Sequence, residues 1–163
     1  EISVQGLVEH GRFPHLEFSR RLTAADHEIV ERAMEQAGVT AWADRDLREL
    51  SGGQRQRVYL AMALAQGGQT ILLDEPTTYL DTAAQFQLME LLQSLAQQGH
   101  TVVMVLHDLA HAMQYSDAVG VFADGKLAAF AEPSQLYEQK IWEKVFQVKL
   151  CKALDGTYYI KPL

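Results

Sequence analysis

The sequence is short of several features that would otherwise narrow its function. It has one cysteine, Cys151, among 163 residues, so no disulfide can form within the chain and a reducing compartment is the simpler expectation. No apolar run approaches the roughly 18 residues needed to cross a bilayer. The net charge of -7 argues against nucleic acid as the main partner. With 48% apolar and 21% charged residues, the composition is typical of a soluble globular protein.

A convincing phosphate-binding loop is also lacking. Residues 120–126 have the spacing G-x-x-x-x-G-K, but Leu127 stands where such a loop needs a hydroxyl group for Mg²⁺. The pair Asp124-Gly125 lies between two apolar runs, which favours a β-hairpin instead. We therefore expect no nucleotide cradle in these residues.

Apolar patterning divides the chain into a helical part and an α/β part. Up to about residue 50, the apolar residues recur at helical spacing. Residues 70–73 and 101–106 are continuous apolar runs, typical of strands in a parallel sheet that helices cover on both faces. Residues 81–98 between them predict an amphipathic helix that ends at Gly99. The rest predicts a hairpin over 119–130, one last helix carrying residues 136–146, and an edge strand at 158–160.

The stretch LSGGQRQR, residues 50–57, places two glycines at the start of an expected apolar helix. Inside a helix, each glycine lowers stability by about 1 kcal/mol relative to alanine. Ser51 and Gln54 have the spacing of a capping box, in which the serine accepts a backbone N–H and the glutamine reaches back. That cap needs neither Gly52 nor Gly53. Bare N–H groups at a helix N-terminus attract anions, so the glycines also indicate a phosphate contact.

Ionisable residues end both expected parallel strands. Open α/β sheets bind ligands beyond the carboxyl ends of their strands, and the first strand runs into Asp74 and Glu75 there. An aspartate suits Mg²⁺, and a neighbouring glutamate can orient or deprotonate an attacking water. His107 ends the second strand and would emerge beside Glu75 if the strands are neighbours. A polar turn helped by Pro76 and a structural histidine are the alternative interpretations.

The order and spacing of these motifs resemble the nucleotide-binding domain of ABC-type ATPases. Residues 50–54 match the family's signature motif, and residues 71–74 match its Walker B strand. The resemblance implies an α/β fold of the P-loop NTPase type, with a mostly parallel sheet, flanking helices and a helical subdomain. Residues 1–50 would be part of that subdomain, and residues 51–163 the C-terminal part of the ATPase core. It also implies that this chain is the C-terminal portion of such an ATPase. We expect this portion to lack the Walker A loop and the Q-loop and to be inactive on its own.

The same resemblance implies roles for single residues. Asp74 would hold Mg²⁺, Glu75 would be the catalytic glutamate, and His107 the switch histidine. Asp81, in the D-loop, would couple two ATP sites across a dimer interface. The residues that would contact ATP held by the partner subunit are Ser51, Gly52, Gly53 and Gln54.

Residues 4–15, VQGLVEHGRFPH, are similar to the start of the helical subdomain in importers of ferric siderophores, haem and cobalamin. That branch implies an ATPase that drives chelate import from the cytoplasmic, inner face of a bacterial cell membrane. The implied partners are a second nucleotide-binding subunit in a homodimer, an integral membrane permease and, indirectly, a substrate-binding protein, with no nucleic acid.

Two other functions fit parts of the sequence. One is a non-transport ABC ATPase that acts in translation or DNA repair, which the acidic balance weakly disfavours. The other is a zinc hydrolase, because HDLAH mimics the zinc-binding pattern H-E-x-x-H through His107 and His111. An aspartate replaces the glutamate there, and His107 closes a strand rather than lying on a helix.

Overall fold

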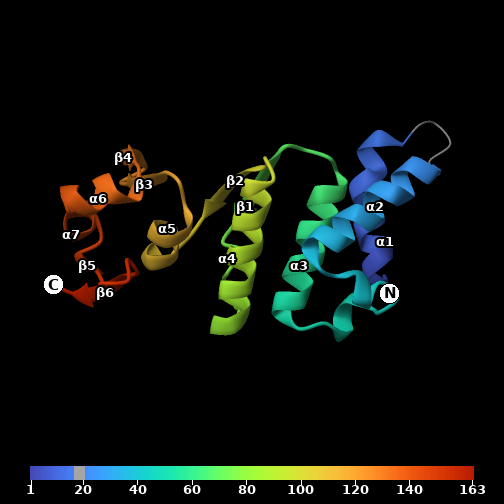
Figure 1. Ribbon diagram of the computed structural model, residues 1–163, viewed down its shortest axis with the longest axis horizontal. Helices are drawn as coiled ribbons and strands as arrows, with labels where there is room; N and C mark the ends of the chain where they lie inside the picture. Colours follow the sequence, from blue (N-terminus) through green and yellow to red (C-terminus); the bar gives the residue numbers. More distant parts are fainter. Residues whose placement is uncertain (17–20) are drawn as a thin grey trace. The chain divides into compact units, whose positions relative to one another are not determined.

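The computed structural model describes residues 1–16 and 21–163, and the chain divides into two compact units, Glu1–Val105 and Leu106–Leu163 (Figure 1). The first unit begins with helices and ends with two strands that flank a helix. Its elements are α1 (Val4–Glu9), η1 (His10–His15), α2 (Ala24–Ala37), η2 (Thr40–Trp42), η3 (Leu47–Glu49), α3 (Gly52–Ala65), β1 (Thr70–Asp74), α4 (Thr82–Gln97) and β2 (Thr101–Val105).

The early helices form where local signals place them. Thr23 and Asp26 make a capping box at the start of α2, and Gly38 ends that helix with a φ of 66°. The apolar stripe of α2 then packs against α1 and α3. Its buried members are Val30, Ala33, Met34 and Ala37. The described part of residues 1–50 is therefore helical, as the apolar spacing predicts.

Strands β1 and β2 pair in parallel, and α4 forms the connection between them. The register runs from Thr70 opposite Thr101 to Asp74 opposite Val105. Asp81 is the N-cap of α4, and Gly99 follows the helix with a φ of 100°. This strand-helix-strand unit confirms the parallel pairing and the helix expected between residues 81 and 98.

One face of this strand pair is open. Ile71 is buried, whereas Leu72 is 74% exposed, Val103 51% and Val105 55%. Successive side chains of a strand point to opposite faces, so covering one face leaves these residues on the other. The expectation of helices on both faces is therefore not met within the described residues of this unit.

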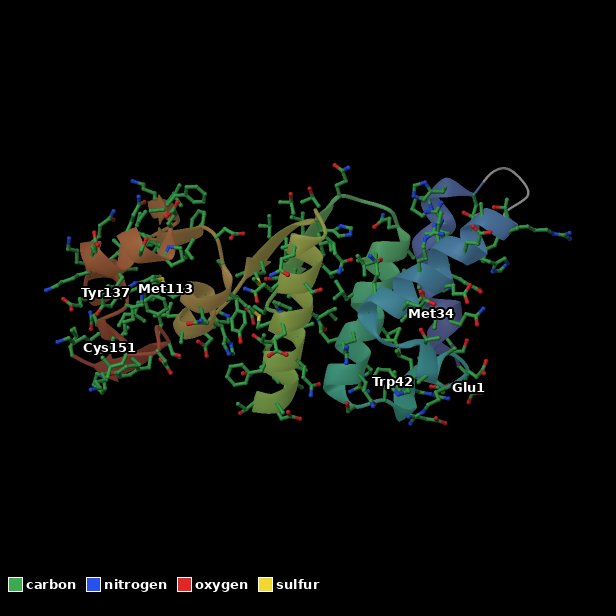
Figure 2. All side chains as sticks on the ribbon, viewed as in Figure 1. Glu1, Met34, Trp42, Met113, Tyr137 and Cys151 are labelled. Carbon is green, nitrogen blue, oxygen red and sulfur yellow. The ribbon has the colours of Figure 1, made fainter. Side chains whose placement is uncertain are left out.

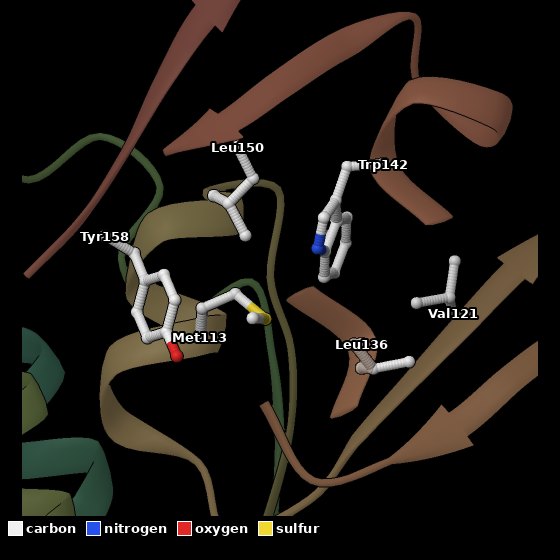
Figure 3. Close-up of a cluster of buried hydrophobic side chains, with 6 residues drawn as sticks. All are labelled: Met113, Val121, Leu136, Trp142, Leu150 and Tyr158. Carbon is white, nitrogen blue, oxygen red and sulfur yellow. The ribbon is translucent and has the colours of Figure 1, made fainter. Parts of the chain in front are cut away.

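The second unit consists of short elements around a small core. They are α5 (Leu109–Tyr115), β3 (Val119–Ala123), β4 (Lys126–Ala131), α6 (Pro133–Gln139), α7 (Ile141–Val145), β5 (Val148–Lys152) and β6 (Tyr158–Pro162). Figure 3 shows the core side chains converging from these elements; they are Met113, Val121, Leu136, Trp142, Leu150 and Tyr158. Hydrophobic burial among them holds the unit together.

The strands of the second unit pair antiparallel, β3 with β4 and β5 with β6. The predicted hairpin is confirmed, since Asp124 and Gly125 form its turn with φ values of 49° and 72°. The predicted edge strand at the C-terminus is also present, as β6. The expectation of a mostly parallel sheet thus holds for β1 and β2, while short turns and loops join the other pairs in antiparallel order.

The prediction of a single last helix carrying residues 136–146 is wrong in detail. Lys140 adopts a left-handed conformation with a φ of 52°, which divides the segment into α6 and α7. Phe146 is the C-cap of α7 rather than a member of its apolar face, and it is 42% exposed. Helical periodicity in the sequence could not reveal a break at a residue that is neither glycine nor proline.

Across residues 1–16 and 21–163, no helix combines the length and apolar character needed to cross a membrane.

Candidate functional site

The start of α3 has the predicted cap. Ser51 donates its backbone N–H to Oε1 of Gln54 at 2.9 Å, and Gln54 donates its own to Oγ of Ser51 at 3.3 Å. Gly52 and Gly53 are the first two residues of the helix. Within the described residues, no protein oxygen accepts from the N–H group of either glycine. The positive end of the α3 dipole is thus open to an anion.

The two glycines have different surroundings. A Cβ atom on Gly53 would lie 2.8 Å from Cβ of Ala84, closer than real side chains approach. A Cβ atom on Gly52 would lie 3.6 Å from Cδ2 of Leu80, an ordinary contact. Helix packing therefore gives Gly53 a reason to be glycine, and this packing is not visible in the sequence.

A groove of about 310 Å³ lies between the starts of α3 and α4. Both helices begin at the lower end of the view in Figure 1, and Trp42 lies beside the start of α3 in Figure 2. The groove combines hydroxyl, amide, carboxylate and guanidinium groups with one indole. Its lining residues are Trp42, Ser51, Gly53, Gln54, Arg57, Asp81, Ala83, Ala84 and Gln87.

Three of the lining residues carry no sequence signal that would have found them. Trp42 belongs to the short η2 turn, and Gln87 lies on the second turn of α4. Arg57 donates from Nε to the carbonyl oxygen of Ala37 at 3.0 Å, so it also closes the C-terminal end of α2. Only the folded chain brings these side chains to the groove.

Glu75 follows Asp74 in a strained turn. Its φ of 47° is uncommon for a residue with a side chain, and its N–H donates to the carbonyl oxygen of Val105 at 3.1 Å. The Thr78 hydroxyl donates to Oε2 of Glu75 at 3.1 Å. The structure therefore fixes the Glu75 backbone at the carboxyl end of the parallel pair, where the sequence places it.

The segment after Glu75 leads to Asp81 and the start of α4. Oδ1 of Asp81 accepts from the N–H of Ala84 at 2.9 Å. Gln85 donates from Nε2 to the carbonyl oxygens of Thr77 and Leu80 at 3.3 and 3.1 Å. These bonds fix the conformation of residues 77–81. As a result, Asp81 shares the groove with Ser51, Gly53 and Gln54.

His107 belongs to the second unit, so its distance from Glu75 stays a prediction. Asp108 is the N-cap of α5 and accepts from the N–H of His111 at 2.9 Å. No group of three or more histidine, cysteine, aspartate or glutamate side chains in the described residues could hold a metal ion. The structure thus gives the zinc alternative no ligand set.

The C-terminal end of α3 is anchored by a buried ion pair. Arg12 donates from Nε to Oδ1 of Asp26 at 2.9 Å and from Nη1 to the carbonyl oxygen of Ala65 at 2.9 Å. Hydrogen bonds from Thr23, together with Arg12, lower the pKa of Asp26 from its ordinary 3.8 to about 2. Nε2 of His15 lies 2.7 Å from the carbonyl oxygen of Gln66. Side chains of the same chain therefore bond to the carbonyl groups at this end of the helix.

Comparisons with known proteins agree with the motifs. A family model described as "ABC transporter" matches residues 3–78. The iron(3+)-hydroxamate import ATP-binding protein FhuC of Bacillus subtilis (strain 168) is 43% identical over 90% of this chain and 55% of its own length. The ferric enterobactin transport ATP-binding protein FepC of Escherichia coli (strain K12) is 40% identical over the whole chain and 62% of its own length.

Solved structures show the same likeness. An ABC transporter in an inward-facing conformation matches 99% of this chain and 66% of its own with a TM-score of 0.88 and 28% identity. A bacterial ABC transporter cassette solved as a dimer matches 81% of this chain and 57% of its own with a TM-score of 0.66 and 27% identity. The chain spans 55% and 62% of the length of the two curated relatives above.

Proposed function

We propose that this chain, which is similar to the ATP-binding domains of ABC transporters, forms part of an ATPase subunit that drives import of an iron chelate. The observation that supports the proposal most is the open N-terminus of α3. Ser51, Gly53 and Asp81 line one groove there, so one surface would join the signature motif to the D-loop.

The anion that fits the start of α3 is the γ-phosphate of ATP held by a second subunit. Ser51, Gly52 and Gly53 would surround that phosphate, because the free N–H groups and the helix dipole both favour negative charge there. Gln54 would contribute by keeping Ser51 in its capping position. The site is composite, since a triphosphate also needs a cradle, which would come from the partner.

The residues at the end of β1 would carry out the hydrolysis of ATP. Asp74, an exposed carboxylate at the end of β1, fits Mg²⁺, which commonly takes one or two carboxylates together with phosphate oxygens and water. Bound there, the ion would neutralise phosphate charge. Glu75 would accept a proton from the attacking water, with Thr78 holding its carboxylate. His107 would contact the γ-phosphate or the water.

The partners follow from the same proposal. A second nucleotide-binding subunit would complete the ATP sites, and Asp81 would face it across the interface. An integral membrane permease would dock on the helical region before Ser51, at the inner face of a bacterial cell membrane. A substrate-binding protein would take part indirectly by delivering the chelate.

The decisive test is Glu75→Gln in the full-length protein. Loss of the general base should lower hydrolysis by about 10²–10⁴-fold while ATP binding persists. Glu90→Gln is the matched control, because Glu90 is an exposed glutamate on α4 outside the groove. Wild-type turnover in Glu75→Gln would remove Glu75 from this role, and absence of ATP hydrolysis by the unmodified protein would refute the proposed function.

The cargo can be tested by uptake. Relatives named for hydroxamate, enterobactin and petrobactin import support a ferric siderophore. A relative named for cobalamin import, 38% identical over the whole chain, supports a second candidate. Cells that lack the gene should lose uptake of labelled ferric hydroxamate or catecholate and keep uptake of cobalamin. The opposite pattern would favour the second candidate.

A further inference from the structure

The contact between Gly53 and Ala84 joins the start of α3 to the start of α4. The Cβ atom that any other residue would add at position 53 meets two atoms within 4 Å, Cβ of Ala84 at 2.8 Å and its Cα at 4.0 Å. The obstacle is thus essentially one methyl group. Protein interiors relax only partly around added atoms, so the helices would have to separate or tilt.

Ala84 cannot give way freely, because its surroundings are fixed by hydrogen bonds. Its N–H is held by Oδ1 of Asp81, and the next residue, Gln85, bonds to the carbonyl oxygens of Thr77 and Leu80. Thr78, inside that segment, bonds to Glu75 through its hydroxyl and its N–H. A shift of Ala84 would therefore pass along the chain to Asp81 and toward Glu75.

We propose that Ala84 is a positioning residue, whose contact with Gly53 fixes the bare start of α3 against the segment that carries Glu75 and Asp81. Both glycines leave their N–H groups bare, and Gly53 is in addition small enough for the two helix starts to meet. This inference rests on the proposed function for its activity readout only, because the contact itself can be tested by stability.

The test is a double-mutant cycle in the full-length protein with Gly53→Ala, Ala84→Gly and the combination of both. Gly53→Ala should lower kcat for ATP hydrolysis about tenfold or more through overpacking, with little change in nucleotide affinity. Removing the opposing methyl group should restore the double variant to within about threefold of Ala84→Gly alone. The thermal unfolding midpoint should recover in parallel.

Two controls make the rescue specific. Ala83→Gly removes a methyl group from the same turn of α4, but Ala83 is not within 4 Å of the Gly53 position, so it should not rescue Gly53→Ala. Gly52→Ala should not be rescued by Ala84→Gly, because Ala84 is not among the atoms within 4 Å of that position.

The outcomes separate the inference from the proposed function. A double variant as impaired as Gly53→Ala, or a harmless Gly53→Ala, would overturn the positioning role. Recovery of stability without recovery of kcat would overturn it as well, since the contact would then serve folding alone. If the unmodified protein does not hydrolyse ATP, the proposed function is refuted. The contact between Gly53 and Ala84 would then be judged by thermal unfolding alone, and a double variant as unstable as Gly53→Ala would overturn it.

Discussion

The two ends of helix α3 are built in opposite ways. At its C-terminal end, Arg12 and His15 bond to the last carbonyl oxygens, and Gly11 lets the backbone come close to Met62. At its N-terminal end, the N–H groups of the two glycines have no acceptor in the described residues. Side chains of the chain itself bond to the carbonyl groups at the negative end of the helix dipole, whereas the positive end is open to an anion. A helix that is fixed at one end can hold the N–H groups of its open end in place, and a rigid anion site requires such fixed donors.

The largest effect should come from filling the open end. Ser51→Arg places a long side chain in the groove, so it should block approach of the partner's phosphate and lower ATP hydrolysis by about 100-fold or more. Nucleotide affinity of the single subunit should change little. Turnover and ATP-dependent dimerisation of the full-length protein measure this.

Ser51→Ala is the matched control for that variant. It removes the cap without adding bulk and should cost about 1 kcal/mol of stability. Tight ATP-dependent dimers in Ser51→Arg would show that the open end of α3 does not face a partner's nucleotide.

The second effect should come from breaking the anchored end. Arg12→Met keeps the apolar stem but leaves the Asp26 carboxylate and the Ala65 carbonyl without their donor. The unfolding midpoint should fall by roughly 5–10 °C. Arg48→Met is the control, because the Arg48 side chain is 69% exposed against 10% for Arg12. Its loss should shift the midpoint by about 1 °C or less. Equal shifts in the two variants would contradict the idea of an anchored end.

How far the sequence predicts each end depends on the range of its contacts. The capping box of Ser51 and Gln54 is local, so spacing alone predicts it, and the Asp124-Gly125 turn is predicted in the same way. Arg12 meets Ala65 across 53 positions, and no periodicity encodes that meeting. The sequence therefore predicts the open end and misses the anchored one.

The candidate site shows the same division. Sequence patterns place Asp74 and Glu75 at a strand end and Ser51 at a helix start, because each depends on neighbouring residues. The contact of Gly53 with Ala84 and the side chains that line the groove depend on how two helices cross. The separation of His107 from Glu75 stays a prediction.

The third effect tests the anchored end by pH. Because the Asp26 pKa is about 2 in the folded chain and higher when unfolded, its contribution to stability is complete above about pH 4. That contribution is lost as the pH falls from there toward 2. Asp26→Asn removes the titrating group, so the gap between wild-type and variant midpoints should be constant from pH 7 to about 4 and then narrow. A gap that does not narrow below pH 4 would show that the pairing of Asp26 with Thr23 and Arg12 contributes no stability through its charge.

The smallest effect returns to the open end. Gln54→Ala deletes the acceptor for the Ser51 N–H, but that bond lies at the surface and water can replace it, so the unfolding midpoint should fall by about 1–2 °C only. Gln54→Glu should restore the midpoint, because a carboxylate also completes a capping box and suits the first turn of a helix. Thermal unfolding of the three proteins in one buffer measures this. If Gln54→Ala lowered the unfolding midpoint as much as Arg12→Met, both ends of α3 would be needed for stability. The start of the helix would then be an unsuitable binding site for an exchangeable phosphate.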